Sequence, residues 1–271
     1  MDLQKEDYMD PLCVQCGQPG EIASPQPIHA GRVLERLREY EDRGDWSAAE
    51  KHLLYWLAEA EANRDARSQL MLHNELMGYY RKQGIREKAI HHAQQAGALV
   101  HQLGMENTVT AGTTWVNFGT VLQAFGESEA GLKYFEQARE NYEKNLPPED
   151  ARLGGLYNNM GLALASCQRY AEARQMFRQA LAVMEKQPSG QLEQAITWLN
   201  QADALEAEMS PEEAEPLLRE HLDRAAELLN DPGLPRDGYY AFVCGKCAPV
   251  FGHYGYFREE AELNRRAGLT S

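Results

Sequence analysis

The apolar positions of this chain follow a fixed order that repeats about every 42 residues. The repeat is clearest in residues 76–80, 115–119 and 157–161. A small residue follows each of these stretches at a fixed offset: Ala89, Gly131 and Ala173. A repeat of this size is one supersecondary unit that stacks on copies of itself, because no unit can bury its apolar face alone.

Within each unit the apolar spacing predicts two helices. In the unit that starts near residue 154, the two sets are Tyr157, Met160, Gly161 and Leu164, then Tyr170, Ala173, Phe177 and Ala180. Similar units start near residues 70 and 112, and weaker ones near 30 and 195. A degenerate unit starts near 241, with Pro249 inside its first helix. We therefore predict an all-α array of five clear helix–turn–helix units and a degenerate C-terminal unit.

The N-terminal part of the chain lacks this pattern. Residues 1–28 contain four prolines and little periodicity, so we predict an irregular segment there and a helical repeat domain over residues 29–271. The first residues contain no apolar core typical of a signal peptide, and no apolar run has the length of a membrane span. With five cysteines in such a chain, we expect reduced thiols and a cytoplasmic location.

The repeat resembles the tetratricopeptide repeat. The positions that carry the resemblance are Trp115, Phe118, Gly119, Leu122, Gly126, Gly131, Phe135 and Ala138. Phe118, Leu122 and Gly131 replace the Leu, Tyr and Ala of the family pattern, and the period exceeds the family's usual 34 residues. The long form is similar to that of kinesin light chains and of the peptide-sensing regulators of Gram-positive bacteria. The resemblance implies a right-handed superhelix whose first helices line a concave face.

Asparagines recur at the positions that the resemblance places on this concave face. Asn117, Asn159 and Asn200 fall at the sixth position of successive units, and Asn74 and Asn158 fall at the fifth. An amide carries both a donor and an acceptor, so a row of asparagines can bond the backbone of an extended peptide. The resemblance implies the same role. Alternatively, these side chains cap turns, bond neighbouring helices or face water.

Two basic residues follow on the same predicted face. Arg81 and Lys82, at the twelfth and thirteenth positions of their unit, can hold a carboxylate of a bound peptide. Alternatively, they only complement the dipole at the end of their helix.

Two Cys-x-x-Cys pairs lie at opposite ends of the chain: Cys13 with Cys16, and Cys244 with Cys247. Each pair supplies half of the four thiolates of a closed zinc site, so zinc is the one cofactor that the sequence suggests. The alternative for Cys244 and Cys247 is that they are small buried hydrophobes, because they fall at core positions of the last unit.

The formal net charge of −14 argues against nucleic acid and anionic membranes as partners. No nucleophile–base or phosphate-loop motif is present, so we predict no enzyme. The function that the sequence favours is a non-catalytic scaffold that binds a protein or an extended peptide. Its alternatives are a peptide-responsive regulatory sensor and an assembly module linked by zinc. The sequence indicates no oligomeric state.

Overall fold

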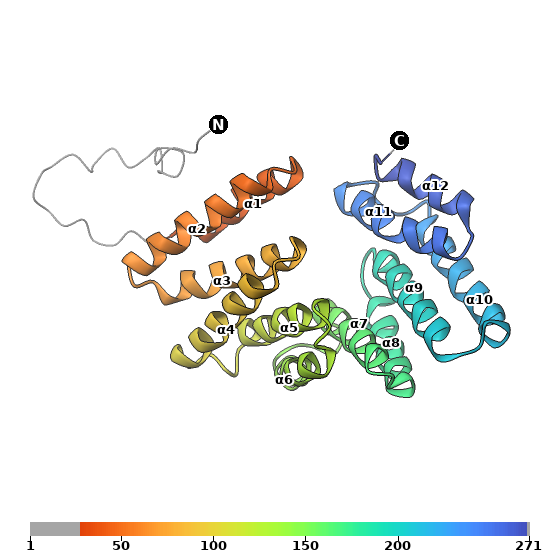
Figure 1. Cartoon of the computed structure of the whole chain (residues 1–271), viewed down its shortest axis with the longest axis horizontal. Coiled ribbons are helices and arrows are strands. Elements are labelled where there is room, and N and C mark those ends of the chain that lie inside the picture. The colour runs from red at the N-terminus through yellow and green to blue at the C-terminus, as the bar shows by residue number, and fades with distance from the viewer. Residues whose placement is uncertain (1–27, 270–271) are drawn as a thin grey trace, which may run out of the picture. The chain divides into compact units, whose positions relative to one another are not determined.

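A computed structural model of the chain describes residues 28–269, which contain twelve α-helices and no strand (Figure 1). The chain divides into two compact units at Glu106 and Asn107. The first unit holds α1 (Ala30–Asp42), α2 (Trp46–Ala62), α3 (Ala66–Lys82) and α4 (Arg86–Gln102). The second unit holds α5 (Val109–Ala124), α6 (Ser128–Asn145), α7 (Ala151–Ser166), α8 (Tyr170–Met184), α9 (Gln191–Glu208), α10 (Pro211–Leu229), α11 (Gly238–His253) and α12 (Phe257–Arg266).

The helices pack in consecutive pairs: α1 with α2, α3 with α4, and so on to α11 with α12. These six pairs confirm the predicted all-α array of five units and a sixth at the C-terminal end. The sixth unit is a complete pair, because α11 continues through Pro249. Its core is formed by Val243, Cys244, Cys247, Phe251 and Leu263. None of the described helices is both long and apolar enough to cross a membrane.

Local sequence signals explain where the helices begin and end. Asp45 and Asp65 accept hydrogen bonds from backbone N–H groups in the first turns of α2 and α3. Ser210 forms a full capping box with Glu213 at the start of α10. Gly84 lies in the left-handed region, with φ of 70°, directly after the end of α3, so it turns the chain into α4.

The recurrent small residues lie where the two helices of a unit approach each other. Gly161 of α7 packs against the ring of Phe177 on α8, where an added Cβ would lie 2.5 Å from Cε1 of that ring. Gly119 of α5 packs against Phe135 of α6 in the same way. A Cβ added at Gly131 would lie 2.9 Å from the backbone oxygen of Gly119. These two glycines therefore allow α5 and α6 to approach each other closely. The repeat motif is therefore a requirement of helix packing.

Candidate peptide-binding face

Four of the predicted asparagines lie on the first helices of the second compact unit. Asn117 belongs to α5, Asn158 and Asn159 to α7, and Asn200 to α9, and all four are partly exposed. Successive first helices contact one another, α5 with α7, α7 with α9, and α9 with α11. We use the name first-helix face for a set of twelve residues on these helices and at the end of α11, each partly or fully exposed: Asn117, Asn158, Asn159, Glu193, Asn200, Asp203, Glu206, Tyr239, Phe242, Lys246, His253 and Tyr254.

Two of these asparagines bond each other across neighbouring units. The Nδ2 of Asn200 donates to the Oδ1 of Asn158 over 3.0 Å. This bond leaves the Nδ2 of Asn158 and the Oδ1 of Asn200 without a hydrogen-bond partner among the described residues. Asn159 likewise forms no hydrogen bond to the part of the chain that the structure describes. The amides thus present both unused donors and unused acceptors at one place.

Two carboxylates, Asp203 and Glu206, also lie on α9, and side chains at the end of α11 contact them. The Tyr254 hydroxyl donates to Asp203 over 3.0 Å and also lies within hydrogen-bonding distance of Glu206. The Nε2 of His253 lies 3.0 Å from the Oε2 of Glu206. These bonds connect the fifth and sixth repeats and fix the orientation of the acidic side chains.

Two of the α9 carboxylates lie in partly dehydrated surroundings. Burial raises the pKa of Asp203 above its usual value, and the hydrogen bond from Tyr254 opposes this effect. Burial also raises the pKa of Glu193, which the positive charge of Lys246 partly offsets. Tyr239 donates a hydrogen bond to Glu193. A cationic partner would favour the charged form of both carboxylates and so oppose the effect of burial.

These carboxylates were not among the site residues predicted from the sequence, although they fall at inward positions of the repeat. In the unit that starts near residue 195, Asp203 falls at the ninth position and Glu206 at the twelfth. Both are positions that the family resemblance assigns to the inner face. The asparagines could be predicted as site residues because they recur in successive units, whereas these acidic side chains occur on α9 alone among the first helices of the predicted row.

The remaining predicted peptide contacts lie on α3, in the first compact unit. Asn74 donates to the backbone oxygen of Leu70 over 2.9 Å, and Lys82 forms an ion pair of 2.8 Å with Glu41. Arg81 is half-buried and forms no ion pair with the described residues. Burial lowers the pKa of its guanidinium. Of the two basic residues, Arg81 is therefore the one whose charge is more available to a carboxylate of a bound peptide.

The structure describes one of the two cysteine pairs. Cys244 and Cys247 are buried on α11, and burial raises the pKa of the Cys247 thiol to about 12. Cys13 and Cys16 lie outside the described residues, so the proposed four-cysteine zinc site stays a prediction. Within residues 28–269, no group of three or more His, Cys, Asp or Glu side chains is placed to hold a metal ion.

Comparison with known proteins now identifies the repeat. Residues 152–230, which span α7 to α10, match the family model described as tetratricopeptide repeat. This part of the chain therefore carries tetratricopeptide repeats. No curated protein matches the sequence at a significant level.

Solved structures share the fold over most of the chain. BtubC (BKLC) from P. vanneervenii superposes with a TM-score of 0.64 at 21% identity, over 78% of this chain and 87% of that protein. A putative kinesin light chain from Podosopora anserina, with nearly identical TPR-like repeats, gives a TM-score of 0.52 at 17% identity. That match covers 74% of this chain and 93% of the other. Both results concern the fold, and they agree with the long-repeat form expected from the sequence.

Proposed function

We propose that this tetratricopeptide repeat protein is a non-catalytic scaffold that binds an extended segment of a partner protein along the first-helix face. The observation that carries the proposal is the amide pair of Asn158 and Asn200 beside Asn159. Their unused donors and acceptors match the alternating C=O and N–H groups of an extended backbone. Such bonds hold a segment whatever its side chains are.

Side-chain preference comes from the neighbouring residues of α9 and α11. Asp203, Glu206 and Glu193 give this part of the face a negative charge, which favours basic residues in the bound segment. Phe242 and Tyr239 stack on each other with ring centroids 6.3 Å apart, and they are 63% and 49% exposed. Large exposed aromatic rings bind apolar side chains. The preferred segment therefore combines an apolar residue with basic ones.

The proposal is tested with peptides selected from a random library displayed against the full chain. We expect Asn159→Ala to lower the affinity for the selected peptides by about fivefold to twentyfold, because one amide makes one or two hydrogen bonds to the peptide. Isothermal titration calorimetry measures the affinities, and circular dichroism checks the fold. Asn264→Ala on α12 is the matched control, because this asparagine lies on a second helix. Equal affinities of wild type and Asn159→Ala would contradict backbone binding at this face.

The acidic preference is tested separately. Asp203→Asn keeps a side chain that accepts the Tyr254 hydroxyl but removes the charge. We expect selected basic peptides to bind about threefold to tenfold more weakly to this variant, with a smaller dependence on salt. Charge-neutral versions of the same peptides should show no difference. If basic and neutral peptides respond alike, the carboxylates do not select the ligand.

The two other hypotheses from the sequence stay predictions. A regulatory sensor requires a change in shape on binding, which small-angle scattering with and without a selected peptide measures. A zinc-linked assembly requires Cys13 and Cys16 to meet the buried thiols of Cys244 and Cys247 on α11. Metal analysis of the reduced protein tests this second hypothesis.

A further inference from the structure

A pocket of about 390 Å³ lies at the C-terminal end of the array, between the start of α11 and the end of α12. Its lining residues are Arg236, Asp237, Tyr240, Ala241, Glu262, Arg265 and Arg266. Three guanidinium groups and two carboxylates therefore face one space, with a formal charge of +1. This is unusual in a chain whose formal net charge is −14.

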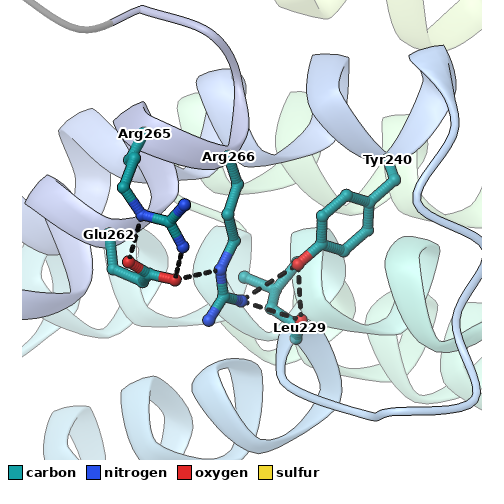
Figure 2. Close-up of polar contacts among 5 residues, drawn as sticks. All are labelled: Leu229, Tyr240, Glu262, Arg265 and Arg266. Carbon is teal, nitrogen blue, oxygen red and sulfur yellow. Dashed lines mark hydrogen bonds and ion pairs between the residues drawn. The ribbon is translucent and has the colours of Figure 1, made fainter.

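Arg266 is fixed at the back of this pocket by contacts from three helices (Figure 2). Its Nη1 donates to the Tyr240 hydroxyl over 3.0 Å and to the backbone oxygen of Leu229 over 3.3 Å. Its Nε donates to Glu262 over 2.7 Å. Only 19% of the Arg266 side chain is exposed, so its guanidinium is held in one place.

A single carboxylate serves two of the arginines. Arg265 donates to both oxygens of Glu262, over 2.9 and 2.7 Å, while Arg266 shares one of these oxygens (Figure 2). The two guanidinium groups lower the pKa of Glu262 to about 2, so it remains charged at neutral pH. One negative charge cannot neutralise two positive ones, and several N–H donors of Arg265 and Arg266 stay unused.

Arg236 has no acidic partner among the described residues. Its guanidinium lies over the Tyr240 ring, 4.2 Å from the ring centroid. Tyr240 thus has one arginine on its ring face and another at its hydroxyl. None of the five N–H donors of Arg236 forms a hydrogen bond within residues 28–269. Asp237 forms no ion pair with it among the described contacts, and its carboxylate accepts the N–H of Tyr240 as the cap of α11.

We propose that this pocket binds an oxyanion presented by an acidic segment of a partner protein. Arg236 and Arg265 supply the exposed donors, and the fixed Arg266 guanidinium supplies the charge behind them. Guanidinium groups match the oxygen pairs of carboxylates and phosphates, so a glutamate and a phosphoserine share the required chemistry. The site does not depend on the proposed peptide binding at the first-helix face.

The test uses two short fluorescent peptides of equal length, one rich in glutamate and one carrying a phosphoserine, and a neutral glutamine peptide. Fluorescence anisotropy with the full chain is measured at about 0.15 M salt, where distant charges are screened. We expect saturable binding of at least one acidic peptide and none of the neutral one. Comparison of the two acidic peptides shows which oxyanion the pocket prefers.

Arg236→Gln should weaken binding of the acidic peptide by at least about tenfold, because it removes a guanidinium that forms no ion pair or hydrogen bond with the described residues and is available to the peptide. Arg265→Gln should act in the same direction. Arg219→Gln is the control, since it removes an equal charge from an exposed ion pair with Glu215 on α10. The proposal is overturned if neither acidic peptide binds, or if Arg236→Gln and Arg265→Gln both bind as tightly as the control.

Discussion

Gly161→Ala will lower the free energy of unfolding by about 2 kcal/mol, although alanine favours helices over glycine by about 1 kcal/mol. The added methyl group would lie 2.5 Å from Cε1 of Phe177, well inside van der Waals contact. Phe177 has no exposed surface, so its ring cannot move away without displacing other core residues. Urea denaturation followed by circular dichroism measures the loss.

Gly155→Ala is the matched control, because it makes the same change on the same helix. Apart from its chain neighbours and the nearby backbone of α7, no heavy atom lies within 4 Å of the position that its Cβ would occupy. We expect this variant to be more stable than wild type by about 0.5–1 kcal/mol. The two glycines should therefore give effects of opposite sign, and a similar effect at both sites would contradict the packing argument.

A double-mutant cycle isolates the contact between Gly161 and Phe177. Phe177→Leu alone leaves a partly empty site in the core and costs about 1–2 kcal/mol. Combined with Gly161→Ala, it makes room for the new methyl group, so the double variant should be more stable than the sum of the single effects predicts. The expected coupling is about 1 kcal/mol. Strict additivity would show that alanine is accommodated in another way.

The period and the paired helices could be predicted from the sequence because they depend on contacts inside one repeat. The small residue at Ala89, Gly131 and Ala173 recurs since each unit must bring its two helices together at that point. Likewise, Gly84 after α3 marks a turn through its backbone conformation alone. Signals of this kind lie within about forty neighbouring residues and repeat along the chain.

The charged parts of the candidate sites could not be predicted in the same way. Asp203 acquires its role from Tyr254, which belongs to the next repeat and is 51 residues away in sequence. The arginine pocket depends on Arg236 in a loop and Arg266 near the end of α12, and no repeat register relates the two. Such pairs occur once in the chain, so periodicity gives no sign of them. Only the tertiary arrangement brings them together.

A buried histidine pair makes the first compact unit sensitive to acid. The Nδ1 atoms of His73 on α3 and His92 on α4 lie 2.8 Å apart, and the residues are only 5% and 7% exposed. One ring must donate to the other, and both rings are neutral at pH 7 because their pKa values lie far below 7. Tyr80 stacks on His92, with ring centroids 5.4 Å apart. A charged ring in this place has little contact with water.

The pKa values of both histidines fall from 6.5 to about 4 in the folded protein. Burial is the main cause for each, and for His92 the nearby charges of His73, His91 and Lys88 add to it. Between these pH values the unfolded chain binds more protons than the folded one. Stability is therefore fully retained above about pH 6.5 and is lost progressively as the pH falls toward 4.

We expect α3 and α4 to lose on the order of 3 kcal/mol of local stability for each of the two histidines that becomes protonated between pH 7 and pH 4, since one pKa unit corresponds to about 1.4 kcal/mol. Hydrogen exchange read by mass spectrometry, corrected for the intrinsic pH dependence of exchange, measures this loss helix by helix. The double variant His73→Gln, His92→Gln cannot take up these protons, so its stability should change less with pH even if it is lower at pH 7. His101→Gln, at an exposed site of α4, should keep the wild-type profile. Parallel profiles for wild type and the double variant would show that acid acts elsewhere in the chain.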